Sequence, residues 1–303
     1  MYSVFIDGSS GTTGLRIRER LGERSDIQLI TLSEELRKDP KAKKEALSSA
    51  DVAFLCLPDA AAVESVQLVE NPKTAIIDTS TAHRTSKGWV YGFPELSGQK
   101  EKIAESKRIA NPGCHASGFI ALVAPLVQHG IVSKDELLSC FSLTGYSGGG
   151  KKMIAEYESD GRSKLLDAPR MYALSQSHKH LKEMQAMCRL DAAPVFCPIV
   201  APYYAGMEVT VPLFNRNKQE IEQLYSEYYA GGLVRFVKDD SEDGFLSAGA
   251  LSTRDDMVIS VFGSDERMIL VARFDNLGKG ASGAALQNMN ILMGINERTG
   301  LNV

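Results

Sequence analysis

Cys114 is the residue whose surroundings best suit covalent chemistry. It lies in the segment Ala-Asn-Pro-Gly-Cys-His (residues 110–115), where Pro112 and Gly113 predict a sharp turn, and the apolar stretch 119–127 predicts a helix directly after it. The field at a helix N-terminus stabilises a thiolate, and the thiolate is the nucleophilic form of cysteine. We therefore predict that Cys114 is a catalytic nucleophile.

The other four cysteines lack such a setting. Cys56, Cys140 and Cys197 lie in strand-like runs and are predicted to be core residues, and nothing around Cys188 indicates catalysis. An odd number of cysteines without a CxxC motif indicates free thiols in a reducing compartment.

A nucleophile needs an acid/base partner, and the chain has five histidines. His178 and His180 form an HxH pair, with Glu183 shortly after it, and this cluster is the candidate acid/base group. Two other interpretations remain open. The cluster is a solvated polar turn, or it is a metal site, because two histidines and a carboxylate can bind iron or zinc.

A glycine-rich turn follows the first predicted strand and opens the first predicted helix. Glycines there let the backbone approach a pyrophosphate, which the free N–H groups of the helix N-terminus favour. The spacing is GxxGxxG rather than the usual GxGxxG, and the alternative is an ordinary strand-to-helix loop. The predicted cofactor contacts are Gly8, Ser10, Gly11, Thr12, Thr13 and Gly14.

The end of the second predicted strand bears on the choice of cofactor. An acidic residue at this position accepts a hydrogen bond from the ribose 2′-hydroxyl of NAD, whereas Ser33 and Arg37 suit the 2′-phosphate of NADP. We therefore predict NADP(H), although Glu34 and Glu35 weaken the pattern.

The elements that must position these residues change character along the chain. In the first half, strands predicted at 2–6, 27–32, 52–57 and 75–78 alternate with helices, which indicates a parallel sheet covered on both faces. Beyond about residue 135, the predicted strands 137–144, 195–200, 207–212, 233–237, 257–262 and 268–274 have fewer helices between them. The fold class is therefore α/β, a Rossmann-type domain plus an α+β domain with a mixed or antiparallel sheet. The segment 283–296 is apolar at helical spacing.

Composition excludes several classes of protein. A chain of 303 residues suggests about two domains. A net charge of −4 without a clustered basic face argues against a nucleic-acid partner. The N-terminal residues have neither a basic region nor a long apolar run, so we expect no signal peptide, no membrane anchor and a cytoplasmic location.

The chain resembles the N-acetyl-gamma-glutamyl-phosphate reductases, in particular their shorter-chain type 2, which is related to the aspartate-semialdehyde dehydrogenase superfamily. The resemblance runs nearly end to end as an ordered set of segments: residues 8–14, DTSTAHR (78–84), YGFPEL (91–96), NPGC (111–114), SGGGK (147–151), HKH (178–180) with Glu183, DNLGKGASG (275–283) and QNMN (287–290).

This resemblance implies a fold and an activity. It implies an NADP-binding Rossmann domain (1–114 and 284–303) and a catalytic, dimerising α+β domain (115–283). It implies the NADPH-dependent reduction of N-acetyl-L-glutamyl 5-phosphate, a small acyl phosphate, to the 5-semialdehyde in arginine biosynthesis. It also implies a homo-oligomer, either a dimer or a tetramer. Phosphate leaves to give a Cys114 thioester, whose oxyanion after reduction is stabilised by backbone N–H groups near residues 113–115.

The resemblance also assigns roles to residues. Cys114 is the nucleophile, and His178, His180 and Glu183 complete the catalytic set. Asn276 holds the nicotinamide amide, and Pro58, Ser147 and Gly148 are further cofactor contacts. The candidate substrate or phosphate contacts are Arg84, Asn111, Lys151 and Tyr172.

Three positions depart from the common pattern of the family. His115 stands where tyrosine is common, Ala205 where longer members often have arginine, and Lys182 where proline is frequent. The alternatives are aspartate-semialdehyde dehydrogenase, the N-acetyl-aminoadipyl-phosphate reductase, a metal enzyme built on the histidine cluster, and a catalytically silent dinucleotide-binding regulator.

Overall fold

A computed structural model describes residues 1–303 and divides them into two compact units. Unit 1 comprises residues 1–112 and 281–301, and unit 2 comprises residues 113–280 and 302–303. These limits differ by two to three residues from the predicted domain boundaries. The difference matters for Cys114, because the structure places it in unit 2 rather than at the end of the first domain.

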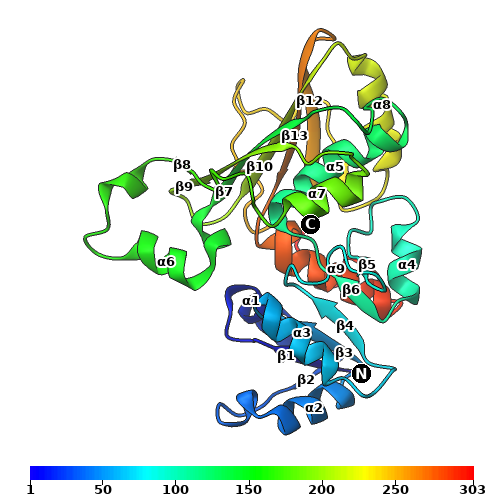
Figure 1. Ribbon diagram of the computed structural model, residues 1–303, viewed down its shortest axis with the longest axis vertical. Coiled ribbons are helices and arrows are strands. Elements are labelled where there is room, and N and C mark those ends of the chain that lie inside the picture. The colour runs from blue at the N-terminus through cyan, green and yellow to red at the C-terminus, as the bar shows by residue number, and fades with distance from the viewer. The chain divides into compact units, whose positions relative to one another are not determined.

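Unit 1 is built on a six-stranded parallel sheet in the order β2-β1-β3-β4-β6-β5 (Figure 1). The predicted alternation of strands and helices is confirmed. The strands are β1 (Tyr2–Asp7), β2 (Ile27–Ile30), β3 (Val52–Leu55), β4 (Ala75–Asp78), β5 (Val90–Tyr91) and β6 (Arg108–Ala110), and the helices are α1 (Thr12–Gly22), α2 (Pro40–Ser49), α3 (Asp59–Gln67), α4 (Gln99–Glu105) and α9 (Gly283–Leu292). The short 3₁₀ helix η1 (Leu36–Lys38) precedes α2.

Helices cover both faces of this sheet, which explains why the central strands β3 and β4 are buried at every residue. One core joins the sheet to α1, α4 and α9 through side chains such as Ile17, Ile103 and Met289. The other core joins it to α2 and α3 through Leu47 and Ala62. Helix α9 is shorter than predicted, because the chain turns at Gly294, which has a φ of +67°.

Unit 2 is built on a seven-stranded mixed sheet in the order β11-β12-β13-β10-β7-β9-β8. Only β11/β12 and β7/β9 are parallel pairs. The strands are β7 (Ser139–Gly145), β8 (Arg170–Met171), β9 (Val195–Ala201), β10 (Met207–Phe214), β11 (Val234–Phe236), β12 (Met257–Gly263) and β13 (Arg267–Phe274), and the helices are α5 (Cys114–Gln128), α6 (Gly150–Glu158), α7 (Leu181–Cys188) and α8 (Lys218–Tyr228). Short turns η2 (Tyr146–Gly149), η3 (Lys164–Asp167) and the π-helical η4 (Gly278–Ser282) complete the chain.

Helix α5 packs directly on the centre of this sheet (Figure 1). A Cβ added at Gly118 would lie 2.5 Å from the Val209 side chain on β10, so only glycine permits this close approach. Helix α8 is tied to α5 by the hydroxyl of Tyr229, which donates to the Ala121 carbonyl at 2.6 Å. The first turn of α5 is therefore held firmly against the sheet.

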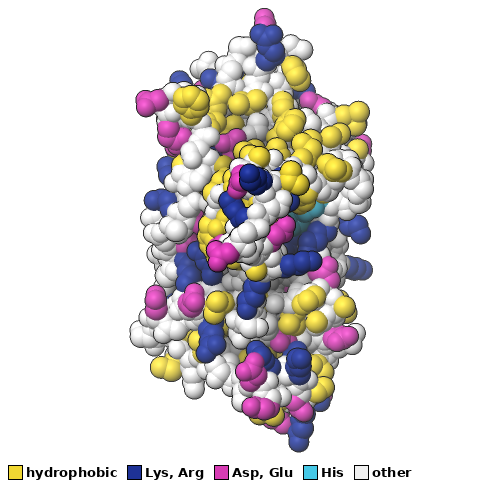
Figure 2. Space-filling model, turned by 90° about the vertical axis from the view of Figure 1, so that its left-hand side faces the viewer, with side chains coloured by type: hydrophobic (Ala, Val, Ile, Leu, Met, Phe, Trp, Pro, Cys, Tyr) yellow, Lys and Arg dark blue, Asp and Glu magenta, His cyan; other side chains and the backbone are white.

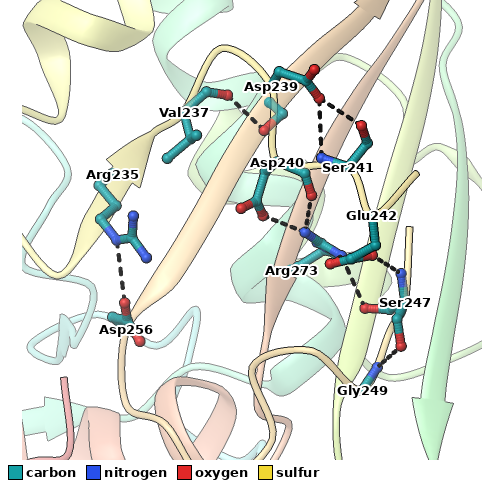
Figure 3. Close-up of polar contacts among 11 residues, drawn as sticks. Arg235, Val237, Asp239, Asp240, Ser241, Glu242, Ser247, Gly249, Asp256 and Arg273 are labelled. Carbon is teal, nitrogen blue, oxygen red and sulfur yellow. Dashed lines mark hydrogen bonds and ion pairs between the residues drawn. The ribbon is translucent and has the colours of Figure 1, made fainter. Parts of the chain in front are cut away.

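The loop from β11 to β12 is anchored on the other face of the sheet by Arg273 of β13 (Figure 3). The buried guanidinium donates to Glu242 at 2.6 Å and to the Ser247 carbonyl at 3.2 Å, and it also pairs with Asp240. At the other end of the loop, Asp256 forms ion pairs with Arg235 and Arg254.

Candidate active site

Cys114 is the first residue of α5, as predicted from the turn that precedes it. Gly113 is the N-cap, with extended φ/ψ angles of −80° and 144°, so the chain enters the helix at the thiol. The Cys114 side chain is half-buried, whereas Cys140 and Cys188 are buried. Burial raises the pKa of the Cys56 thiol to about 12, which leaves that cysteine inert at neutral pH. Among these thiols, Cys114 combines access with the field of a helix N-terminus.

Glu183 of α7 is connected to the turn in front of the nucleophile. Its Oε2 accepts a hydrogen bond from the Gly113 N–H at 3.1 Å, and its Oε1 lies 3.9 Å from Nε2 of His180. The expectation that the N–H groups around residues 113–115 stabilise an oxyanion therefore needs correction at Gly113, whose N–H is already bonded to Glu183. The remaining donors are the N–H groups at the start of α5 ahead of Ser117, whose own N–H donates to the Gly113 carbonyl at 2.9 Å.

The structure brings the predicted histidine pair to the start of α5. The rings of His178 and His180 lie 4.7 Å apart, and both contact the ring of His115, at 5.7 and 5.6 Å respectively. The backbone N–H of His180 donates to Nδ1 of His178 at 3.2 Å. The pair is thus part of a packed cluster, which contradicts the interpretation as a solvated turn.

His115 is the centre of this cluster, although in the sequence it stood out only as a departure from the family pattern. Its Nδ1 lies 2.7 Å from Oγ of Ser142 on β7, and its Nε2 lies 2.6 Å from the hydroxyl of Tyr172. Burial, with a smaller effect from the charge of His178, lowers the pKa of His115 to about 3. His115 is therefore neutral at physiological pH. Its position next to the nucleophile was the one signal that pointed to it.

Tyr172 is the predicted substrate contact that lies within the cluster. Burial raises the pKa of its phenol, and the nearby charge of Cys114 raises it further. Lys151, by contrast, is exposed at the start of α6, where the structure gives it no partner.

Asn276 and Ser147, both predicted cofactor contacts, are hydrogen-bonded to each other in unit 2. The Asn276 amide donates to Ser147 Oγ at 3.0 Å and accepts from the Gly206 N–H at 2.9 Å. A Cβ added at Gly148 would lie 3.5 Å from the same amide nitrogen. The amide is therefore held in one orientation, with its oxygen and nitrogen fixed.

The glycine turn in unit 1 has the shape of a phosphate cradle. Gly8 has a φ of +87°, and a Cβ at Gly14 would lie 2.4 Å from the Gly8 carbonyl oxygen, so both positions require glycine. Gly11 is the N-cap of α1, whose first turn contains Thr12, Thr13 and Gly14 and no acidic residue. Its N–H groups and dipole favour an anion.

A cavity of about 540 Å³ extends from this turn to the end of β2. Its lining includes Ser10 and four basic residues that suit a phosphate: Arg18, Arg37, Lys38 and Lys43. Arg37 forms an ion pair with Glu34, and Lys43 lies 3.0 Å from Asp7. Ser33 is exposed next to this lining, and Pro58 is the N-cap of α3. A glycine cradle joined to a basic cavity fits the phosphates of a dinucleotide.

Arg84 and Asn111 are paired in unit 1. The buried Arg84 side chain donates to the Asn111 carbonyl at 2.9 Å and to the Thr79 carbonyl at 3.1 Å. Asp78 orders the same loop, because its carboxylate binds His83 Nδ1 at 2.6 Å and the Ser80 hydroxyl at 2.7 Å. The sequence had shown this segment only as a motif, without the Asp78–His83 pair.

The chain contains no group of three His, Cys, Asp or Glu side chains arranged to hold a metal ion. Glu183, the carboxylate of the metal alternative, is instead bonded to the Gly113 backbone. None of the helices combines the length and apolarity needed to cross a membrane.

Comparison with known proteins matches both halves of the chain. Residues 9–106 match the family model "Semialdehyde dehydrogenase, NAD binding domain", and residues 114–276 match "Semialdehyde dehydrogenase, dimerisation domain". An N-acetyl-gamma-glutamyl-phosphate reductase 2 from Nostoc sp. is 45% identical, with 98% of each chain covered. The namesake from Pseudomonas putida is 43% identical, with 96% of each covered. The chain belongs to the N-acetyl-gamma-glutamyl-phosphate reductase family.

Solved structures confirm the fold of this family member. Aspartate semialdehyde dehydrogenase II from Vibrio cholerae superposes with a TM-score of 0.73 at 16% identity, covering 97% of this chain and 98% of that one. Aspartate semialdehyde dehydrogenase with NADP from Candida albicans gives a TM-score of 0.69 at 14% identity, covering 97% and 99%. The predicted combination of a Rossmann-type domain and a mixed-sheet domain is thereby confirmed.

Proposed function

We propose that this chain reduces N-acetyl-L-glutamyl 5-phosphate to N-acetyl-L-glutamate 5-semialdehyde in arginine biosynthesis, with release of phosphate. The observation that carries the proposal is the half-buried Cys114 at the first position of α5, directly before His115, whose ring contacts His178 and His180 and is hydrogen-bonded to Tyr172. Relatives of 43% to 45% identity over nearly the whole chain bear the name of this activity.

The first step is acylation of the thiol. The Cys114 thiolate attacks the carbonyl carbon of the acyl phosphate, a C–S bond forms, and the C–O bond to phosphate breaks with its electron pair leaving on phosphate. Glu183 supports this step by fixing the Gly113 turn, which sets the position of the sulfur.

The second step converts the thioester to the aldehyde. NADPH, when bound, supplies the hydride that reduces the thioester carbon. Negative charge then develops on the carbonyl oxygen, where the N–H groups of the first turn of α5 stabilise it. The product of this reduction is a thiohemiacetal attached to Cys114. Its collapse breaks the C–S bond and returns the electron pair to the sulfur of Cys114. His178 or His180 carries the proton to and from that oxygen, a contribution typically worth ~10²–10⁴-fold in rate.

The cofactor proposed is NADP(H), held by the glycine turn and the basic cavity of unit 1. Arg18, Arg37, Lys38 and Lys43 line that cavity, and a 2′-phosphate is the group of NADP that would match such a lining. The predicted contacts Ser33 and Pro58 flank the same region, and Asn276 and Ser147 of unit 2 are proposed for the nicotinamide amide.

The test is the reverse reaction, because the aldehyde is more stable than the acyl phosphate. NADPH formation is followed by absorbance with the semialdehyde, phosphate and NADP for the wild type, for Cys114→Ser and for Cys197→Ser, which changes a half-buried cysteine on β9. Phosphate-dependent turnover that Cys114→Ser abolishes and Cys197→Ser retains supports the proposal. Turnover with aspartate semialdehyde but not with the proposed semialdehyde would show that the proposed substrate is wrong. Normal turnover of Cys114→Ser would overturn the thioester mechanism.

We also propose that the protein is a cytoplasmic homo-oligomer that pairs through the open face of the unit 2 sheet. Phe141, Val195, Phe214 and Ile269 are exposed side chains of β7, β9, β10 and β13 that alternate with the inward-facing residues. Figure 2 shows hydrophobic side chains gathered over the upper part of its view. Light scattering of wild type and of Phe214→Glu tests the proposal, since a monomeric wild type would contradict it.

A further inference from the structure

Both ring nitrogens of the buried His115 are hydrogen-bonded to hydroxyl groups, and the proposed reaction gives this residue no role. Nδ1 lies 2.7 Å from Ser142 Oγ and Nε2 lies 2.6 Å from the Tyr172 hydroxyl. Only 3% of His115 is exposed, and the ring is further enclosed by Phe196, at 5.3 Å between centroids. A neutral imidazole has one N–H donor and one acceptor nitrogen, so the two hydroxyls cannot play the same part.

Ser142 decides which nitrogen carries the proton. It is fully buried on β7, and His115 is the only hydrogen-bond partner of its hydroxyl in the structure. If Nδ1 carried the proton, the Ser142 hydroxyl would accept from it and its own proton would be left buried without an acceptor, at a cost of about 1–3 kcal/mol. The Ser142 hydroxyl therefore donates to Nδ1, and the proton of His115 is on Nε2.

This assignment determines the direction of the Tyr172 hydroxyl. Nε2–H donates to the phenol oxygen, so the phenol proton is not used in the bond to His115. Tyr172 is only half-buried, so its phenol proton, unlike that of Ser142, does not need an acceptor within the protein. Cys114 directly precedes His115 at the start of α5, so the bond from His115 holds the phenol near the nucleophile. In agreement with this, the negative charge of Cys114 contributes to raising the pKa of Tyr172. A phenol of raised pKa keeps its proton at neutral pH and can donate it to an anion.

We propose that Tyr172 is a catalytic residue that donates a hydrogen bond to the reacting group on Cys114, and that His115, fixed by Ser142, is the positioning residue that directs this donor. In the free enzyme the phenol has no hydrogen bond to Cys114, and its O–H dipole acts on the thiolate only through space. In the reaction proposed above, on which this part rests, the acceptor is the oxyanion of the thiohemiacetal. No proton leaves Tyr172 in either state, because the phenol acts only as a hydrogen-bond donor.

Other ionisable groups surround the start of α5 and must stay constant in any test. They are His178 on the segment before α7, and His180 and Glu183 at the start of α7. The informative substitutions are therefore Tyr172→Phe, which removes only the hydroxyl, and the pair His115→Leu and His115→Gln. The amide of glutamine retains an N–H donor at the distance of Nε2, whereas leucine has none.

The first measurement is ¹⁵N NMR of the histidine rings, with the His115 signals assigned by their loss in His115→Gln. A protonated Nε2 and an unprotonated Nδ1 at pH 7 are expected. A protonated Nδ1 would overturn the proposed direction of the hydrogen bonds from Ser142 through His115 to Tyr172, whatever reaction the protein catalyses.

The second measurement is the pH midpoint of Cys114 alkylation by iodoacetamide, which needs no substrate. Tyr172→Phe and His115→Leu are expected to move the midpoint to higher pH, and His115→Gln to keep it near the wild-type value. Ser260→Ala is the matched control, because it removes another buried serine hydroxyl of the same sheet, one that donates to the Val237 carbonyl. An unchanged midpoint in Tyr172→Phe would overturn the proposed donor.

Turnover completes the test once the wild type is shown to reduce the proposed substrate. Tyr172→Phe is expected to lower kcat by about 10²-fold with little change in KM, the scale of one oxyanion donor. The double variant His115→Leu, Tyr172→Phe should be no slower than Tyr172→Phe, because His115 acts through Tyr172. Additive losses would show that His115 acts independently and would overturn the positioning role.

Discussion

Glu183 of α7 holds the Gly113 N–H at 3.1 Å, one residue before the thiol of Cys114. A helix nearly seventy residues further along the chain thereby fixes the turn that presents the nucleophile. The carboxylate is also 3.9 Å from His180, so one side chain connects the turn to the histidine cluster.

Replacing Glu183 by alanine is expected to destabilise unit 2 by about 1–3 kcal/mol, because the buried Gly113 N–H loses its acceptor. Glu183→Gln retains a carbonyl oxygen for that N–H and should keep most of the stability. Urea unfolding and kcat of both variants check the prediction. Equal stability of Glu183→Ala and wild type would show that the bond does not hold the turn.

Gly280 leaves room for Cys114. A Cβ added there would lie 2.9 Å from the Cβ of Cys114 and 3.1 Å from the Asp275 carbonyl oxygen. Gly280→Ala is therefore expected to displace the thiol and lower kcat by about 10- to 100-fold, since small displacements of reacting groups reduce rates strongly. Binding of NADPH, measured by fluorescence, should persist. Gly249→Ala is the control, because its nearest neighbour would be 3.7 Å away.

Arg37 is expected to distinguish NADPH from NADH. It lines the basic cavity of unit 1 and is paired with Glu34. Loss of one charge-assisted hydrogen bond to phosphate in Arg37→Gln should raise the KM for NADPH about 10- to 100-fold and leave that for NADH nearly unchanged. Glu34→Gln removes only the competing carboxylate and should not weaken NADPH binding. An equal rise in the KM for NADPH and for NADH would show that Arg37 does not bind the 2′-phosphate.

His115 gives the stability of unit 2 a defined pH dependence. Its pKa is about 3 in the folded chain, below the unfolded value of about 6.5. The unfolded chain therefore binds a proton that the folded chain does not, and stability falls as pH drops from about 6.5 towards 3, by up to ~1.4 kcal/mol per pH unit. His115→Gln should lose less stability than wild type between pH 7 and pH 5. His129→Gln, at the exposed end of α5, should follow the wild-type curve.

The sequence predicted those parts of the site that depend on local signals. Pro112 and Gly113 placed Cys114 at a helix start, and the glycine turn after β1 followed from its own residues. The partners of His115 did not follow, because Ser142 of β7 lies next to it only through the packing of α5 on the unit 2 sheet. The bond from Gly113 to Glu183 has the same origin, since no periodicity relates residues of different helices.

The return of α9 to unit 1 has a consequence for the order in which the protein folds on the ribosome. Ala285, Leu286, Met289 and Ile291 fill the same core as Val4 and Ile17, which are translated long before them. One apolar face of the nascent unit 1 sheet therefore stays incompletely covered until α9 has been made. Unit 2 is nearly continuous in sequence, so it can complete its core first, and the N-terminal strands of the enzyme reach their final state last.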